Sequence, residues 1–95
     1  MIKHLENENF NELISKGTTL VDFYAEWCGP CKMMATELEK MTDKNILKVN
    51  TDNFPSIATS YGVMSIPTLI LIKDGKEVKR TIGYHTAAEI EKIFN

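Results

Sequence analysis

The sequence predicts an α/β fold in which a central mixed β-sheet is flanked by helices on both faces, with the elements in the order βαβαβαββα. Two observations support this prediction. Short apolar runs that suit strands alternate along the chain with segments of helical periodicity, and the last two strand candidates are joined by a hairpin turn. The length of 95 residues suits one domain, which we expect to span residues 1–95.

The first predicted strand and helix are both short. Residues 2–5 are expected to form the strand. Phe10, Leu13 and Ile14 then recur at the spacing of one helix face. Gly17 suits the C-terminal end of this helix, because glycine readily adopts the left-handed conformation found there.

The second predicted strand and helix border the only two cysteines of the chain. Residues 19–25 form a nearly continuous apolar run, which is typical of a strand covered on both faces. Pro30 then begins a helix, because a proline in the first helical turn removes no intrahelical hydrogen bond. Met34, Leu38 and Met41 are expected to form the apolar stripe of that helix.

The second half of the chain is predicted to contain three strands and two helices. The strands are expected at residues 46–49, 68–72 and 78–82. A short helix is expected over residues 53–62, and the Asp-Gly pair at residues 74–75 predicts a hairpin turn between the last two strands. Thr86 and Glu89 have the spacing of a capping box, which predicts the start of the final helix.

The composition is that of an ordinary globular protein, with 43% hydrophobic and 25% charged residues. The net charge is −2 and no basic stripe is present, so we expect no nucleic-acid partner. Residues 1–9 lack the apolar core of a secretory signal, and the longest apolar stretch, residues 69–72, is too short to cross a bilayer. We therefore expect a cytoplasmic protein with no membrane partner. We also expect it to be a monomer.

Cys28 and Cys31 lie where a buried strand is predicted to end and a helix to begin. A free cysteine has a pKa of about 8.5, and only its thiolate attacks disulfides. The positive end of a helix dipole stabilises an anion by roughly 0.3–2 kcal/mol. A hydrogen bond from the Cys31 thiol to the Cys28 sulfur would add about 1.5–3 kcal/mol. The two effects together would bring the pKa of the Cys28 thiol close to neutral pH.

The order of the two cysteines predicts their roles in thiol–disulfide exchange. Residues three apart lie on the same side of a helical turn, so the two sulfurs can meet. Cys28 precedes the helix and should be the exposed attacking thiol, whereas Cys31 should be more buried and resolve the mixed disulfide. Gly29 would keep the approach of a substrate open, and Pro30 would stiffen the loop.

Two other interpretations of the cysteine pair have to be considered. The cysteines could be ordinary buried thiols, or they could be half of a zinc site. A closed structural zinc site is usually four-coordinate. His4 and His85 alone could complete such a site, and neither belongs to a second pair of ligands, so we expect no metal site.

Asp22 is predicted to be a buried proton acceptor. Its sequence neighbours are apolar on both faces of the strand, which places this carboxyl group in the covered centre of the sheet. Burial without full compensation raises the pKa of a carboxyl group. A carboxylate of raised pKa near Cys31 is suited to accept the proton that Cys31 loses when it attacks the mixed disulfide.

Three segments of the chain resemble the thioredoxin family. Residues 21–32, Val-Asp-Phe-Tyr-Ala-Glu-Trp-Cys-Gly-Pro-Cys-Lys, resemble its active-site segment. Residues 61–68, Tyr-Gly-Val-Met-Ser-Ile-Pro-Thr, resemble its second signature, and residues 73–76 resemble its hairpin. The Gly-Pro pair between the cysteines is typical of thioredoxins, whereas glutaredoxins, protein disulfide isomerases and periplasmic oxidases generally have other dipeptides. The order of elements matches from residue 2 to residue 94, which implies a thioredoxin-like fold.

The resemblance implies a role for each residue that matches a family motif. It makes Cys28 the nucleophile and Cys31 the resolving thiol. Pro67 matches a cis-proline, and Ile66 matches the residue whose backbone pairs with a bound substrate strand. The remaining matches are Trp27, Gly83 and residues 62–66 at the apolar rim of the substrate groove, Asp22 as the buried carboxylate, and Lys48 as the lysine near it.

The resemblance also implies the overall reaction. A member of this family is a dithiol electron carrier that reduces the disulfides of client proteins and binds no cofactor. Its own disulfide is reduced by a thioredoxin reductase, a flavoprotein that takes electrons from NADPH. A disulfide oxidase or isomerase, and a binding module in which the thiols are incidental, are the alternative functions.

The sequence departs from the usual thioredoxin pattern at three places. Thr36 stands where many members have a helix-kinking proline, so we expect a straighter second helix. The segment of residues 37–46 is a few residues shorter than usual, and Tyr24 replaces a common tryptophan. None of these positions is expected to contact the thiols.

Overall fold

The computed structural model describes residues 1–95, which form one five-stranded sheet with four helices around it. The strands are β1 (Ile2–His4), β2 (Thr18–Tyr24), β3 (Ile46–Asn50), β4 (Thr68–Lys73) and β5 (Lys76–Ile82). The helices are α1 (Phe10–Leu13), α2 (Gly29–Glu39), α3 (Pro55–Ser60) and α4 (Ala87–Phe94). The predicted order of elements, βαβαβαββα, is therefore confirmed.

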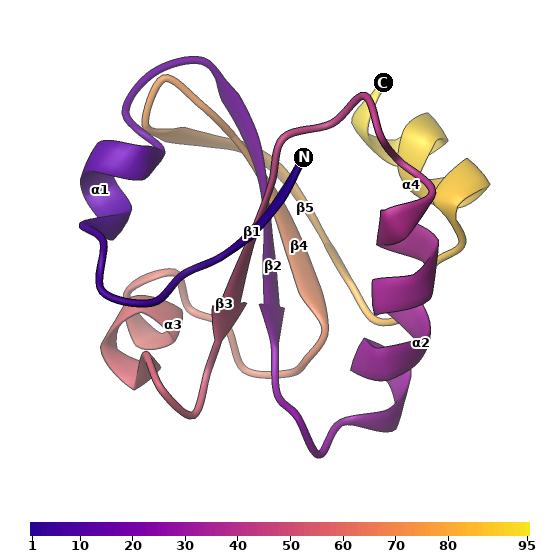
Figure 1. Ribbon diagram of the computed structural model, residues 1–95, viewed down its shortest axis with the longest axis horizontal. Helices are drawn as coiled ribbons and strands as arrows, with labels where there is room; N and C mark the ends of the chain where they lie inside the picture. Colours follow the sequence, from indigo (N-terminus) through magenta and orange to yellow (C-terminus); the bar gives the residue numbers. More distant parts are fainter.

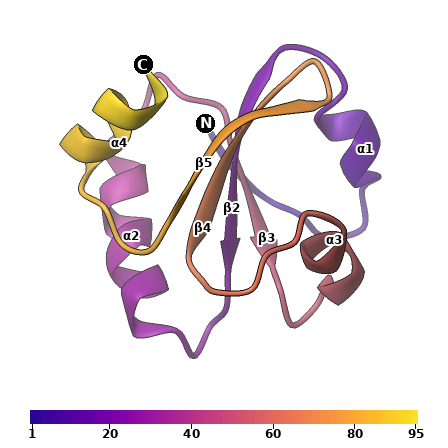
Figure 2. The same cartoon turned by 180° about the vertical axis from the view of Figure 1, so that it is seen from behind.

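The sheet is mixed, and β2 is its central strand. The strands lie in the order β1-β3-β2-β4-β5. β3 runs parallel to both β1 and β2, whereas β4 runs antiparallel to β2 and β5. Helices α1 and α3 lie on one face of the sheet and α2 and α4 on the other, as Figures 1 and 2 show from opposite sides.

Each face of the sheet has its own apolar core. The core under α1 and α3 consists of Leu5, Phe10, Ile14, Val21, Phe23, Leu47, Val49, Ala58, Ile70 and Ile72. The core under α2 and α4 consists of Leu20, Met34, Leu38, Met41, Ile46, Leu69 and Ile90. Side chains alternate between the two faces along a strand. Asp22 is two residues from Leu20 and therefore points to the α2 face.

The predicted turns and helix starts are largely confirmed. Asp74 and Gly75 both have positive φ, at 49° and 83°, as a tight two-residue hairpin turn requires. Thr86 and Glu89 form the predicted capping box at the start of α4. Helix α2 begins at Gly29 and has Pro30 in its first turn.

Two predicted helix ends are wrong. α1 ends at Leu13, and Gly17 does not terminate it. Gly17 instead lies in the turn before β2, where its N–H donates to the Asp74 carboxylate at 2.8 Å. Met41 lies beyond α2, because the N–H of Lys40 and that of Met41 bond to carbonyls three residues back and tighten the end of the helix. Met41 is still buried in the core under α2 and α4.

No helix combines the length and the apolar composition that are needed to span a membrane. α2, the longest helix, has 11 residues and runs without interruption through Thr36.

Candidate active site

The two cysteines connect the central strand to the helix that covers it. Cys28 has extended backbone angles and is the N-cap of α2, while Cys31 is in the first turn of that helix. The Cys31 backbone N–H donates to the Cys28 sulfur at 3.2 Å. The two residues form a disulfide, with their Cα atoms 5.2 Å apart. The helix thus directs both an N–H group and the positive end of its dipole at the Cys28 sulfur.

Burial of the cysteines differs from the prediction. Cys31 is buried, as expected, but Cys28 is buried as well, with only 5% of its surface exposed. The prediction that Cys28 is an exposed thiol is therefore wrong for this disulfide form. The Cys28 sulfur is bonded to Cys31, Ala25 lies in the same buried cluster, and Tyr24 and Ile66 pack against that cluster. The expectation that Tyr24 lies apart from the two cysteines is therefore wrong.

The loop before β4 forms the wall opposite the cysteines. The Ile66–Pro67 peptide bond is cis, which confirms the prediction for Pro67. The Ile66 carbonyl oxygen lies 3.9 Å from the Cys28 sulfur. The Gly83 N–H donates to the Pro67 carbonyl at 2.8 Å, and Gly83 has a φ of +93°, which favours glycine. The structure thus brings Ile66, Pro67 and Gly83 together beside the disulfide.

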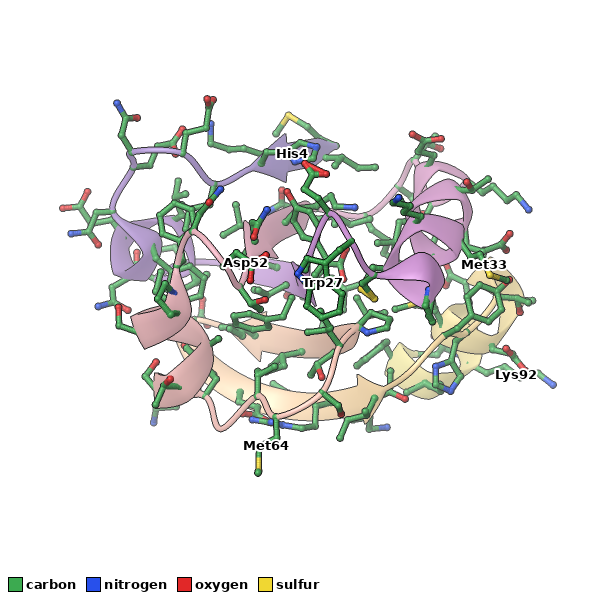
Figure 3. All side chains as sticks on the ribbon, turned by 90° about the horizontal axis from the view of Figure 1, so that it is seen from below. His4, Trp27, Met33, Asp52, Met64 and Lys92 are labelled. Carbon is green, nitrogen blue, oxygen red and sulfur yellow. A yellow bond between two sulfur atoms is a disulfide. The ribbon has the colours of Figure 1, made fainter.

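Trp27, the residue before Cys28, is the most exposed aromatic side chain near the disulfide. Trp27 is 70% exposed, and its indole N–H donates to the Asp52 carboxylate at 2.9 Å. Figure 3 shows Trp27 beside Asp52, Met33 on α2, and Met64 projecting outward from the loop before β4. The apolar ring of Trp27, next to Cys28 in the chain, is therefore open to a partner.

Gly29 and Pro30 are also exposed at the start of α2. A Cβ atom built on Gly29 would meet nothing within 4 Å. The free protein therefore has room for a side chain at position 29, and any steric need for glycine there must come from a bound partner.

Asp22 and Lys48 form a buried ion pair on the α2 side of the sheet. They occupy paired positions on β2 and β3, and the Lys48 Nζ lies 3.3 Å from the Asp22 Oδ2. Asp22 is 1% exposed, and neither of its carboxylate oxygens receives a hydrogen bond. Desolvation raises the pKa of Asp22, and the nearby Lys48 charge offsets only part of that effect.

The sheet register extends this pair into a row of polar side chains. His4 on β1 is the register partner of Lys48, as Asp22 is on the other side. Tyr24 lies one strand repeat beyond Asp22, its ring centroid 4.7 Å from the Lys48 Nζ. The Tyr24 hydroxyl lies 3.3 Å from Nδ1 of His4.

Sequence analysis missed two contacts of this site. Asp52, the partner of Trp27, was not singled out, although it follows β3 and the carboxyl ends of parallel strands meet at one edge of a sheet. His4 was considered only as a zinc ligand. The structure has no group of three or more His, Cys, Asp and Glu residues that could hold a metal ion.

The sequence profile of the family described as Thioredoxin matches residues 1–95. The chain belongs to the thioredoxin family. The thioredoxin of Chlamydia caviae is 48% identical over 99 residues, covering 100% of this chain and 97% of its own. The thioredoxin of Listeria monocytogenes is 40% identical over 100 residues, with the same coverage of 100% and 97%.

Solved structures agree with the family and the fold. A mutant thioredoxin from Halobacterium salinarum has a TM-score of 0.87 and 30% identity, covering 96% of this chain and 85% of that one. A chain from a study of thiol resolution in yeast mitochondrial 1-Cys peroxiredoxin has a TM-score of 0.82 and 34% identity, covering 98% and 93%. The disulfide-forming pair stands at the active-site position of the thioredoxin family. The protein is a thiol–disulfide oxidoreductase with protein-disulfide reductase activity.

Proposed function

We propose that this protein reduces disulfides of client proteins in the cytoplasm, with Cys28 as the attacking thiol and Cys31 as the resolving thiol. It would act as a monomer and as one functional domain over residues 1–95. A thioredoxin reductase would return it to the dithiol form with electrons from NADPH. The observation that carries the assignment of roles is the hydrogen bond from the Cys31 N–H to the Cys28 sulfur at the start of α2.

The first step forms a mixed disulfide with the client. The Cys28 thiolate attacks one sulfur of the client disulfide, and the other client sulfur leaves as a thiolate. The N–H group and the helix dipole at the Cys28 sulfur stabilise its anion more than its thiol. Cys31 lies inside the first turn of α2 and not at its N-cap, which supports Cys28 as the nucleophile.

The second step releases the client in its reduced form. Cys31 loses a proton, its sulfur attacks the Cys28 sulfur, and the second client sulfur leaves as a thiolate. The protein is left with the Cys28–Cys31 disulfide, and two electrons have passed to the client. We propose that Asp22 accepts the proton of Cys31. Its burial and raised pKa support this role.

We propose that a client binds as an extended strand against the loop before β4. The Ile66 carbonyl lies beside the Cys28 sulfur and is suited to pair with a substrate backbone, as in strand addition. Trp27, Gly29, Pro30, Pro67 and Gly83 would line the approach. Lys48 would support the site through its ion pair with Asp22.

Trapping with single-cysteine variants tests the assignment of the two thiols. Cys31→Ser should accumulate mixed disulfides with a disulfide-bonded test protein through Cys28, since the resolving sulfur is missing. Cys28→Ser should trap none. Non-reducing electrophoresis and mass spectrometry of the linked peptides identify the bond. Mixed disulfides formed through Cys31 would reverse the assignment.

A coupled assay tests the source of electrons. The wild-type protein should reduce the test protein only when both NADPH and a thioredoxin reductase are present. NADPH oxidation is followed by absorbance. An active dithiol protein that no thioredoxin reductase re-reduces would contradict this part of the proposal.

A further inference from the structure

A solvent-facing pocket of about 190 Å³ lies beside Cys31 on the α2 side of the sheet. Its lining consists of His4, Tyr24, Ala25, Glu26, Cys31, Lys32, Ala35 and Lys48. The lining is mixed, with polar groups from His4, Tyr24, Glu26, Lys32 and Lys48. A space of this size has room for several water molecules, each of which occupies about 30 Å³ in the liquid, and these groups can bind them. The pocket therefore connects Cys31 and Lys48 to bulk solvent without passing the face of the disulfide where Ile66 lies.

Asp22 lies behind Lys48, away from solvent. Both Asp22 oxygens are buried and receive no hydrogen bond, and the ammonium group of Lys48 is the cation paired with them. The charge state of Asp22 therefore depends on where the Lys48 ammonium group sits. A lysine side chain is long and flexible, so some other group must hold it at this point.

Tyr24 is placed to hold Lys48 in this position. Its ring faces the Lys48 ammonium group at 4.7 Å, within the range of a cation–π contact. The Tyr24 hydroxyl lies 3.3 Å from Nδ1 of His4, and the two rings meet edge to face at 6.2 Å. His4, from the edge strand β1, thus fixes the ring that covers Lys48.

We propose that Tyr24, supported by His4, is a positioning residue that keeps Lys48 against Asp22, and that the pocket lined by Tyr24, His4 and Lys48 is the route by which the proton of Cys31 reaches solvent. This inference rests on the proposed role of Asp22 in the second step. In that step Asp22 accepts the proton of Cys31, the Cys28–Cys31 bond forms, and the Cys28–client bond breaks. Asp22 then returns the proton to solvent past Lys48, which lines the pocket.

The charged and titratable groups around Lys48 come from every element that borders the pocket. They are His4 on β1, Asp22 and Tyr24 on β2, Glu26 after β2, Cys31 and Lys32 on α2, and Lys48 itself on β3. Glu26 is exposed at the pocket and carries a charge that could attract Lys48 away from Asp22. Loss of the Tyr24 ring should therefore let the ammonium group move toward Glu26 and solvent.

The principal test is the pH dependence of the second step in Tyr24→Leu. Reaction of the dithiol protein with an aromatic disulfide releases one coloured thiolate when Cys28 attacks and another when Cys31 resolves. With Lys48 farther from Asp22, the pKa of Asp22 should rise further, so less of the base is ionised at neutral pH. We expect the second release to slow about tenfold at pH 7 and to recover as the pH is raised.

Tyr61→Leu is the matched control. Tyr61 is half-buried like Tyr24, but it packs against Phe10 and Phe23 in the core on the other face of the sheet. It should lose packing without changing the pH profile of the second release. A titration of the Asp22 carboxyl group by carbon NMR gives a readout independent of activity, and its midpoint should rise in Tyr24→Leu only. An unchanged Asp22 midpoint in Tyr24→Leu would overturn the proposal.

The contribution of His4 is tested with the conservative variant Tyr24→Phe, which keeps the ring and loses the hydroxyl group. Tyr24→Phe should shift the Asp22 titration in the wild-type background and leave it unchanged in a His4→Leu background, because the hydroxyl acts through His4. An equal shift in both backgrounds would contradict the role of His4.

Asp22→Asn separates this inference from the function on which it rests. If Asp22 is the base, Asp22→Asn removes the corresponding step from the pH profile of the second release. Suppose that Asp22→Asn loses the Asp22 step from its pH profile and that Tyr24→Leu keeps the wild-type profile. Only the positioning role of Tyr24 would then be refuted. A wild-type profile in Asp22→Asn would instead refute the proton transfer to Asp22.

Discussion

At the scale of single residues, the chemistry depends on how each polar group is buried. The Cys28 sulfur accepts a hydrogen bond from the Cys31 N–H group, which stabilises a negative charge on the sulfur. The Asp22 carboxylate accepts no hydrogen bond, although it is buried in the centre of the sheet. The environment thus favours the Cys28 thiolate and disfavours the Asp22 carboxylate. Such opposite shifts let one group act as nucleophile and the other as proton acceptor.

The stability of the protein should depend on Asp22 with a definite sign. The pKa of Asp22 is raised in the folded protein, mainly by desolvation, so the folded state binds this proton more tightly than the unfolded state does. The free energy of unfolding should therefore decrease as the pH rises from about 4, the pKa of an unfolded aspartate, through the higher folded pKa.

Asp22→Asn should remove this loss and be more stable than the wild type at pH 7 to 8. Urea unfolding of the oxidised proteins at a series of pH values measures the difference. At pH 3, where aspartic acid is neutral in both states, the two proteins should have similar stability. If the variant is less stable than the wild type at pH 8, the prediction is wrong. The attraction between Lys48 and ionised Asp22 would then exceed the desolvation cost of Asp22.

Most residues of the site could be predicted from the sequence, because they belong to short local motifs. Cys28, Cys31 and Pro67 are examples, and Asp22 was recognised from the apolar residues around it. The contacts of Tyr24 and Asp52 could not be predicted in this way. They join residues that are far apart in the sequence. Whether such residues meet depends on the register between strands and on loop conformations, which no local motif specifies.

At the scale of elements, the active-site helix and the C-terminal helix are joined by one carboxylate. The Glu37 Oε1 on α2 accepts a hydrogen bond from the Ala87 N–H at the start of α4, at 2.9 Å. The Glu37 Oε2 is paired with Lys40 at 2.9 Å. The hydrogen bond from Ala87 is the main cause of the lowered pKa of Glu37, and Lys40 contributes next.

Glu37→Gln should reduce the sensitivity of the fold to acid. A lowered pKa means that Glu37 stabilises the folded state above about pH 4.3, the value for an unfolded glutamate, and loses this contribution as the pH falls through the folded pKa. Glutamine can still accept the Ala87 N–H but has no charge to lose. The free energy of unfolding between pH 5 and pH 2 should therefore fall less steeply than in the wild type.

Glu39→Gln is the control for this prediction, because Glu39 is an exposed residue of the same helix. It should follow the wild-type dependence on pH. Equal slopes for Glu37→Gln and the wild type would show that the link between α2 and α4 does not depend on the charge of Glu37.

Helix ends were the least predictable feature at this scale. The end of α2 depends on two hydrogen bonds that reach three residues back, to Glu37 and Leu38, and the apolar spacing continues past them to Met41. Spacing alone therefore extended the helix too far. The hairpin at Asp74 and Gly75 was predicted correctly because its turn needs two positive φ values, which few residue pairs adopt.

At the scale of the whole molecule, the sequence predicted the layers but not the order of the strands. The alternation of strands and helices is enough to indicate a sheet covered on both faces. The order β1-β3-β2-β4-β5 depends on how each connection crosses the sheet. The central position of β2 was indicated in advance by its apolar residues on both faces, since an edge strand is less completely covered.

The central position of β2 also predicts how the backbone exchanges hydrogen with solvent. β2 is paired with β3 on one side and β4 on the other, whereas β1 has only three residues and α1 only four. In hydrogen–deuterium exchange, the amides of Val21 and Phe23 should be released only by unfolding of the entire chain, while those of β1 and α1 should exchange through local opening. The free energy of opening from the slowest amides should equal the free energy of unfolding measured in urea. Protection of β2 no greater than that of β1 would contradict this prediction.

Cys28 follows β2 after only a short turn. The reactive sulfurs would therefore stay in place while the edges of the protein open and close.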